Sequence, residues 1–235
     1  MTYKEVMEEL KKHGSDQTKK VLMNHGAKEP FFGVKVGDMK PIVKKIKKDY
    51  KLSLDLYDTG NSDAMYFAGL IADENLMTKK DLQKWAKNAY WYMLSEYTVP
   101  WITAESNHGF ELALEWIDSD KEMIAAAGWA TLSNLVSIKD DDELDLKLLK
   151  KLLKRVEKDL QNSKNRVRHT MNGFVIALGC YVEDLTIEAL KTADKVGKVN
   201  VDMGGTACKV PAAREYIQKV KDKNRIGKKR KMARC

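Results

Sequence analysis

Residues 90–101 combine an unusual number of aromatic side chains with a single carboxylate. The segment reads Tyr-Trp-Tyr-Met-Leu-Ser-Glu-Tyr-Thr-Val-Pro-Trp, so five of its twelve residues are aromatic, whereas the whole chain of 235 residues has only nineteen. Flat rings around an acid can bind a planar or cationic ligand through stacking and cation–π contacts. The same rings can instead pack a junction between helices. With both interpretations open, the first candidate site residues are Glu96, Trp91, Tyr92 and Trp101.

Pro100 predicts an unusual environment for Glu96. Proline has no N–H, so a helix that ran through it would leave the carbonyl of Glu96 without a partner, and the kink could expose the acid. Alternatively, Pro100 opens the next helix. We expect Glu96 to be partly buried in a concave groove, where its carboxylate needs a hydrogen-bond donor or a cation to stay ionised. Tyr92 and Tyr97 are the nearest aromatic donors in sequence.

Other chemical signals are weaker. Arg166, Arg168 and His169 fall in the first turns of one expected helix, where they could face a phosphate backbone or form a solvated helix end. The three cysteines are widely spaced and form no Cys-x-x-Cys pair, and no glycine-rich phosphate loop is present. We therefore expect no metal, cofactor or disulfide. The absence of a signal peptide or long apolar run favours a cytoplasmic protein.

The positive charge is concentrated at the C-terminal end. The net charge is +8, and residues 221–235 hold eight Lys or Arg and one Asp, so residues 1–220 carry only about +1. Such a tail attracts polyanions by releasing counterions, or it is simply a solvated end. The candidates for nucleic-acid contact in this tail are Lys228, Lys229, Arg230 and Lys231.

Helical periodicity dominates the chain. Leu149, Leu152, Leu153 and Val156 recur at three- and four-residue steps, and no sustained two-residue alternation is present, so we predict an all-α fold. We expect a helical-repeat domain over residues 1–222, with an irregular loop at about 196–211, and a basic tail over residues 223–235. The expected helices cover about 2–12, 16–25, 38–49, 63–73, 79–97, 101–117, 121–136, 149–160, 164–181, 184–195 and 212–222.

A weak internal repeat indicates the architecture. Gly69, Gly128 and Gly173 each follow a Ser-Asp or Ser-Lys pair and each precede a large apolar residue. Glycine inside a helix costs about 1 kcal/mol relative to alanine, so its recurrence suggests close approach of helices. We predict a HEAT-like superhelix of five or six helical pairs, with an irregular helical bundle as the alternative.

The chain resembles the AlkD-like DNA alkylation repair proteins, which are HEAT-repeat glycosylases that remove positively charged alkylated purines from DNA. Three stretches carry the resemblance: Trp91-Tyr92 with Glu96 and Val99-Pro100, Trp116-Ile117 with Ser119-Asp120, and Ser163-Lys164 with Gly173-Phe174. The resemblance implies that Glu96 stands at the catalytic aspartate position. In that chemistry a carboxylate stabilises the positive charge that develops on the sugar as the glycosidic bond breaks.

The resemblance is incomplete at the residues that would hold DNA. Arginines implied by the family fall within residues 125–128 (Ala-Ala-Ala-Gly) and at Ala177, and the basic tail could replace them. The sequence therefore predicts a DNA-binding protein related to alkylation repair, with duplex DNA as its partner, and leaves open whether bases are excised. The alternative is a non-catalytic HEAT-like scaffold that binds a protein or nucleic acid through its concave face.

Overall fold

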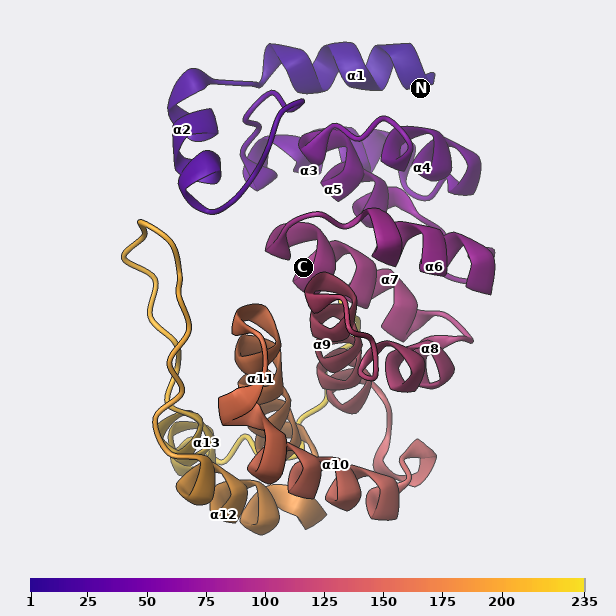
Figure 1. Cartoon of the computed structure of the whole chain (residues 1–235). Helices are drawn as coiled ribbons and strands as arrows, with labels where there is room; N and C mark the ends of the chain where they lie inside the picture. The colour runs from indigo at the N-terminus through magenta and orange to yellow at the C-terminus, as the bar shows by residue number, and fades with distance from the viewer. Residues whose placement is uncertain (235) are drawn as a thin grey trace.

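The computed structural model describes residues 1–234, which are built from helices (Figure 1). Within that range the chain forms thirteen α-helices and no β-strand, so the all-α prediction is confirmed. A π-helical segment, η1 (Met93–Thr98), joins two of them. The α-helices are α1 (Tyr3–Lys12), α2 (Asp16–Asn24), α3 (Val36–Ile46), α4 (Tyr50–Tyr57), α5 (Ser62–Ile71), α6 (Lys79–Asn88), α7 (Val99–Glu105), α8 (Gly109–Trp116), α9 (Glu122–Ile138), α10 (Leu146–Asp159), α11 (Asn165–Tyr181), α12 (Thr186–Val196) and α13 (Ala213–Asp222).

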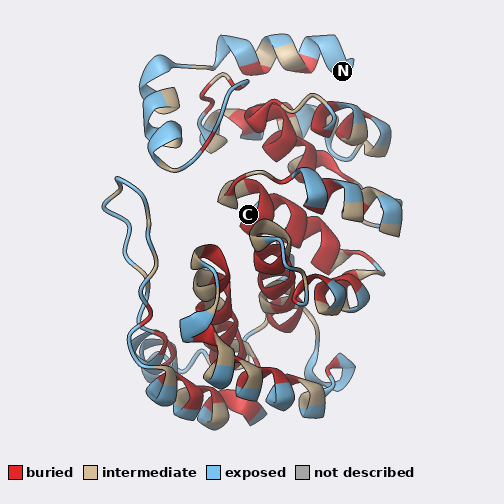
Figure 2. Ribbon diagram, in the orientation of Figure 1, coloured by how far each residue is buried: buried red, intermediate tan, exposed pale blue. Residues whose placement is uncertain are grey.

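Several successive helices pair, such as α4 with α5 and α8 with α9, and the helices stack from α1 at one end of the molecule to α12 and α13 at the other (Figure 1). The helices α5, α7, α9 and α11 form a largely buried layer, whereas α1, α2, α10 and α12 each show an exposed face (Figure 2). Helix α9 contacts α7, α8 and α11, so it lies at the centre of the stack. The buried layer therefore forms the frame on which the candidate site is built.

Local sequence explains where individual helices begin. In α10, Leu149, Leu152, Leu153 and Val156 are buried, as their spacing predicts, and the lysines between them face solvent. The side chain of Asp145 accepts a hydrogen bond from the N–H of Leu148 and caps the helix. Periodicity and capping thus agree at this helix, which explains why it could be predicted.

Some expected helices were wrong in extent. The helix expected over residues 79–97 ends at Asn88, and the one expected over 101–117 is divided into α7 and α8 at the turn after Glu105. Helix α4 was not expected at all. Helix α3 begins at Val36, two residues before the start expected for it, and contains Pro41. These errors arise because short helices are defined by tertiary packing more than by their own sequence pattern.

The repeated glycines permit close helix contact at two of three positions. A Cβ on Gly69 would lie 2.5 Å from the side chain of Thr98, and one on Gly128 would lie 2.7 Å from the backbone nitrogen of Ile117. A Cβ on Gly173 would have no neighbour within 4 Å. Close approach is therefore confirmed at Gly69 and Gly128 and wrong at Gly173.

Replacing Gly128 with alanine should destabilise the protein by about 1–3 kcal/mol, because its new Cβ would overlap the rigid backbone of α8. Gly173→Ala is the matched control, since the same helix-favouring change there meets no obstacle and should stabilise by up to about 1 kcal/mol. Chemical denaturation followed by circular dichroism measures both. Equal shifts of the two midpoints would contradict the close contact at Gly128.

A long loop, residues 197–212, leaves α12 and extends along the stack toward α2 (Figure 1). Near its tip, a Cβ on Gly204 would lie 2.9 Å from the carbonyl oxygen of Asn24, the last residue of α2. Lower in the loop, the side-chain amide of Asn165 donates to the carbonyl of Asp202 and its oxygen accepts from the N–H of the same residue. The loop therefore links the last helical pair to the first.

The basic tail folds back onto the repeats. We call residues 223–234 the C-terminal strap. The N–H of Gly227 donates to the carbonyl of Cys180 at the end of α11, and the N–H of Arg230 donates to that of Ser137 at the end of α9. Ala233 is fully buried. The interpretation of the tail as a solvated end is wrong, because its donors satisfy carbonyl groups that helix C-termini leave free.

No helix within residues 1–234 combines the length and the apolar character that crossing a lipid bilayer requires.

Candidate functional site

Glu96 is buried within the π-helical segment between α6 and α7. It lies in η1, which leads directly into α7, and its side chain is only 3% exposed. Within η1 the N–H of Val99 reaches back five residues to the carbonyl of Leu94. The next residue, Pro100, has no N–H to donate, so the wider π turn leads smoothly into a helix that begins near proline.

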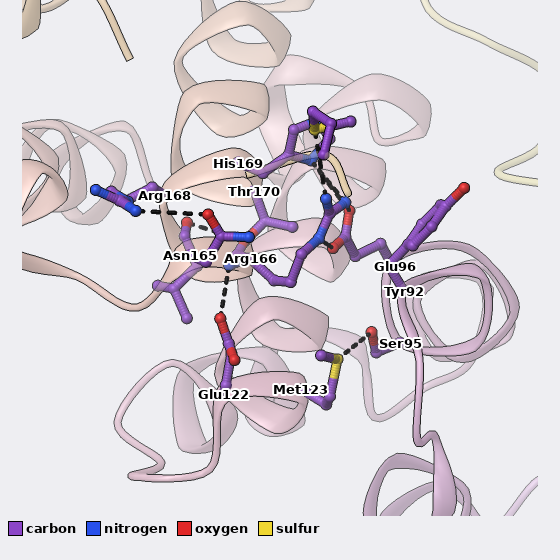
Figure 3. A network of polar contacts seen from close by, with 12 residues as sticks. Tyr92, Ser95, Glu96, Glu122, Met123, Asn165, Arg166, Arg168, His169 and Thr170 are labelled. Atoms are coloured by element: carbon purple, nitrogen blue, oxygen red, sulfur yellow. Dashed lines mark hydrogen bonds and ion pairs between the residues drawn. The ribbon is translucent and has the colours of Figure 1, made fainter. Parts of the chain in front are cut away.

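The partner of the Glu96 carboxylate is Arg166, in the first turn of α11 (Figure 3). The Nε of Arg166 donates to Oε1 of Glu96 over 2.6 Å, and an Nη donates to Oε2 over 2.7 Å. Such a two-pronged contact matches the planar guanidinium to the planar carboxylate. Burial alone would lower the pKa of Arg166, but the paired Glu96 outweighs burial and raises that pKa. The pair is therefore a fixed ion pair inside the protein.

His169 and Tyr92 complete the contacts around this pair. The Nδ1 of His169 lies 3.0 Å from Oε2 of Glu96, one helical turn along α11 from Arg166. On the other side, the guanidinium of Arg166 stacks over the ring of Tyr92, with 4.7 Å between its carbon and the ring centroid. Mainly through burial, the pKa of Tyr92 is raised to about 12, so its hydroxyl stays protonated beside Nδ1 of His25, 3.0 Å away.

The two tryptophans of the segment are core residues. Trp91 and Trp101 are both buried, and Trp101 packs edge-on against Tyr66 and Tyr97. Neither indole offers a free face to solvent. Both tryptophans of residues 90–101 therefore pack a junction between helices and are not placed to bind a ligand. Tyr92, in contrast, has a half-buried ring beside the charged pair.

The loop over residues 197–212 lies against the same pair. The sulfur of Met203 is 3.6 Å from an Nη of Arg166, and the Asn165–Asp202 hydrogen bonds hold the adjoining backbone next to it. The end of α2 also approaches the site, through the His25–Tyr92 contact. The carboxylate of Glu96 is thus in contact with Arg166 and His169, and Met203 of the loop lies against Arg166.

Arg168 is not part of this network. Its side chain points away from Glu96 and contacts the side-chain oxygen of Asn165 at 3.4 Å (Figure 3). It lines a cavity of about 900 Å³ at the base of the loop, together with Lys198 and Lys209. Arg168 makes no ion pair within residues 1–234, and the same cavity is also lined by Asp194, Asp202 and Glu215.

Known proteins resemble this chain along nearly its whole length. The family model described as DNA alkylation repair enzyme matches residues 6–217. The chain belongs to this family. An uncharacterized protein of Listeria monocytogenes, Lmo0209, is 32% identical over 231 residues, which cover 96% of this chain and 100% of the relative. An uncharacterized protein of Listeria innocua, Lin0241, is also 32% identical, over 95% of this chain and 99% of its own.

One solved structure is similar over 100% of both chains, with 40% sequence identity and a TM-score of 0.92. It represents a new family of proteins related to the HEAT-like repeat DNA glycosylases, with affinity for branched DNA structures. The HEAT-like repeat fold and the resemblance to the DNA alkylation repair family are therefore confirmed.

The positions where the family resemblance implies arginines differ in their surroundings. Residues 125–127 are buried alanines, and Gly128 packs against the backbone of α8, so this stretch serves helix packing. Ala177 instead lines a second cavity, of about 880 Å³, whose wall also includes Lys228, Lys229, Arg230 and Lys231 of the strap. The expectation that the tail replaces missing cations stays a prediction, but at Ala177 the geometry agrees with it.

The predicted site residues do not form one site: Trp91 and Trp101 are core residues, Arg168 lines the cavity at the base of the loop, and the others lie near the two ends of α11. Glu96, Tyr92 and Arg166 lie at the N-terminal end of α11, while the four strap cations lie near its C-terminal end. Sequence reasoning missed the pairing of Glu96 with Arg166, because the two are 70 residues apart. The visible signal was the three-residue spacing of Arg166 and His169, which places both side chains on one face of a helix. Within residues 1–234, no group of three His, Cys, Asp or Glu side chains is arranged to hold a metal ion.

Proposed function

We propose that this protein binds branched DNA and does not excise bases from it. The observation that carries the second part is the buried, two-pronged ion pair between Arg166 and Glu96. Affinity for DNA is supported by membership of the DNA alkylation repair enzyme family. The preference for branched DNA is supported by the relative of known structure, which is 40% identical and has affinity for branched DNA.

The ion pair opposes excision for a chemical reason. A carboxylate assists cleavage of a glycosidic bond by stabilising positive charge that develops on the sugar, and it must face that sugar to do so. Both oxygens of Glu96 already accept hydrogen bonds from a guanidinium, which neutralises the charge that the reaction would use. Breaking this buried pair would cost several kcal/mol before any substrate gained from the freed carboxylate.

Access opposes excision as well. A nucleotide must leave the base stack and enter a pocket before an enzyme can act on its glycosidic bond. Glu96 and Trp91 are both almost fully buried, and Met203 and His25 lie over the charged pair and Tyr92. A flipped nucleotide would have to displace the loop as well as Arg166. In this proposal Glu96 positions helices and does not carry out chemistry.

A direct test incubates the protein with duplex DNA containing cationic alkylated purines and measures released base by chromatography. We expect no release above the spontaneous rate, together with tighter binding to a four-way junction than to a linear duplex of the same sequence. Glu96→Gln should also release no base and should still bind the four-way junction more tightly than the duplex. Glu8→Gln, a change at an exposed acid on α1, is the matched control.

The outcomes separate the alternatives. Base release by the unaltered protein that disappears in Glu96→Gln but persists in Glu8→Gln would establish excision and overturn the proposal. Equal affinity for junction and duplex would remove the preference for branches. Failure to bind any DNA would instead favour a scaffold for a protein partner.

A further inference from the structure

The cavity that includes Ala177 is a groove with an unusual charge. We call it the strap groove. Its walls are formed by α9, α11, α13 and the C-terminal strap, and its volume is about 880 Å³. Eight cationic residues and no Asp or Glu line it. The cations are Lys219, Lys223, Arg225, Lys228, Lys229, Arg230, Lys231 and Arg234.

Two of these cations hold the strap in place. Lys229 lies 2.7 Å from a carboxylate oxygen of Asp141, and its ammonium also donates to the carbonyl of Val136. Arg234 pairs with Glu105 over 2.6 Å and also with Glu74. The other six cations have no carboxylate partner within residues 1–234. Their charges are left uncompensated around one groove, which is costly in self-repulsion unless an anion enters.

The uncharged part of the lining suits a sugar–phosphate backbone. Tyr181 and Tyr216 line the groove with hydroxyl groups, and the side-chain amide of Asn134 keeps one hydrogen beyond the one it donates to the carbonyl of Ala130. The two serines of α9 that line the groove donate their hydroxyl hydrogens to carbonyls of their own helix. Asparagine and tyrosine side chains, like Lys and Arg, donate hydrogen bonds to phosphate and sugar oxygens in DNA complexes. Tyr216 is 50% exposed, so its ring is accessible to a stacked sugar or base.

The cations lie close to these neutral groups. Burial raises the pKa of Tyr181, whereas the positive charges of Arg230 and Arg225 act to lower it, so both guanidinium groups act on the tyrosine. The N–H groups of Gly227 and Arg230 are bonded to the ends of α11 and α9, which fixes the backbone that carries the charges. A site built in advance loses little entropy when its ligand binds.

We propose that the strap groove binds the sugar–phosphate backbone of one arm of a branched DNA. This inference rests on the proposed function and names the surface responsible for it. The groove lies at the C-terminal end of α11, and the Glu96–Arg166 pair lies at the N-terminal end, fifteen residues or about 20 Å away along the helix. The groove is therefore independent of the position where the family resemblance places the chemistry.

The test removes three strap cations that anchor nothing. Lys223, Arg225 and Lys228 are exposed and lack a carboxylate partner within residues 1–234, so Lys223→Ala, Arg225→Ala and Lys228→Ala are combined in one variant. Binding to a fluorescent four-way junction and to a linear duplex is measured by anisotropy at several salt concentrations. The matched control combines Lys147→Ala, Lys151→Ala and Lys154→Ala, three exposed lysines of α10.

We expect the strap variant to lose at least about tenfold in junction affinity at low salt, and the slope of log affinity against log salt to fall by about two to three. The α10 variant should keep both values. A charge-retaining variant, Arg225→Lys with Lys228→Arg, should bind like the unaltered protein, which separates charge from folding. Thermal melting confirms that each variant is folded.

The outcomes separate this inference from the proposed function. If the unaltered protein prefers the junction and the strap variant binds the junction as tightly as the unaltered protein does, the strap groove is not the DNA-binding surface, while the proposed function stands. Equal losses in the strap and α10 variants would also overturn the groove, because they would indicate diffuse attraction. If the unaltered protein binds neither DNA, both fail.

Discussion

Arg166→Ala is expected to destabilise the protein by about 3–5 kcal/mol, because it leaves the Glu96 carboxylate buried without its cation. For a chain of this length such a loss should lower the melting temperature by roughly 6–20 °C. His169 is the remaining close partner of Glu96, and its single ring nitrogen cannot replace the two guanidinium contacts. Chemical denaturation gives the change in the free energy of unfolding, provided that its dependence on denaturant concentration, the m-value, is the same in both proteins.

The companion variants show whether the charge is the cause. Glu96→Gln should cost a similar amount, about 3–5 kcal/mol, because it leaves the Arg166 guanidinium, 10% exposed, without its anion. The double variant Glu96→Gln with Arg166→Ala should be more stable than Arg166→Ala alone, since it leaves no buried charge behind. Additive costs in this cycle would mean that the two side chains do not stabilise each other.

Arg234→Ala should destabilise the protein by about 2–4 kcal/mol, because Arg234 lies between two largely buried carboxylates at the end of the strap. Its guanidinium contacts Glu105 through two nitrogens, at 2.9 Å and 2.6 Å, and also donates to the carbonyl of Ala72. Without it, Glu105 keeps only the backbone N–H groups of residues 233 and 234.

Hydrogen exchange measures where the loss occurs. The N–H of Arg230, which donates to Ser137, should exchange faster in Arg234→Ala as the strap loosens. Lys228→Ala is the control, since this exposed strap lysine has no carboxylate partner within residues 1–234 and should change stability by less than about 0.5 kcal/mol. Similar effects of the two changes would mean that Arg234 does not anchor the strap.

The sequence predicted the repeat architecture well wherever apolar spacing and caps agreed. Helix α10 shows this, since its leucines are buried in the predicted pattern. The region after Asn88 could not be predicted, because η1 depends on a proline, on aromatic packing and on contacts with α9 that no local pattern reveals. Local periodicity identifies which face of a helix is buried, and it cannot identify what that face will meet.

The candidate site was predicted in part for the same reason. The aromatic residues around Glu96 indicated a partly buried acid, and the structure buries it almost completely, with 6% of its surface exposed. Its partner Arg166 was expected either to face a phosphate backbone or to belong to a solvated helix end, and both expectations were wrong. Only the folded chain brings α11 against η1 and turns that cation inward.

The strap also changes how the protein should respond to denaturation. In simple repeat arrays each unit contacts only its neighbours, so the array can unravel from one end as a zipper does. Here Arg234 bonds to Ala72, 162 residues earlier, and Lys229 and Gly227 fasten two of the helices between them. Fraying at the C-terminus therefore releases contacts in the middle of the array as well. The molecule is consequently expected to unfold as one cooperative unit. Its folding is expected to be slower than that of a simple repeat array, because these contacts join residues far apart in the sequence.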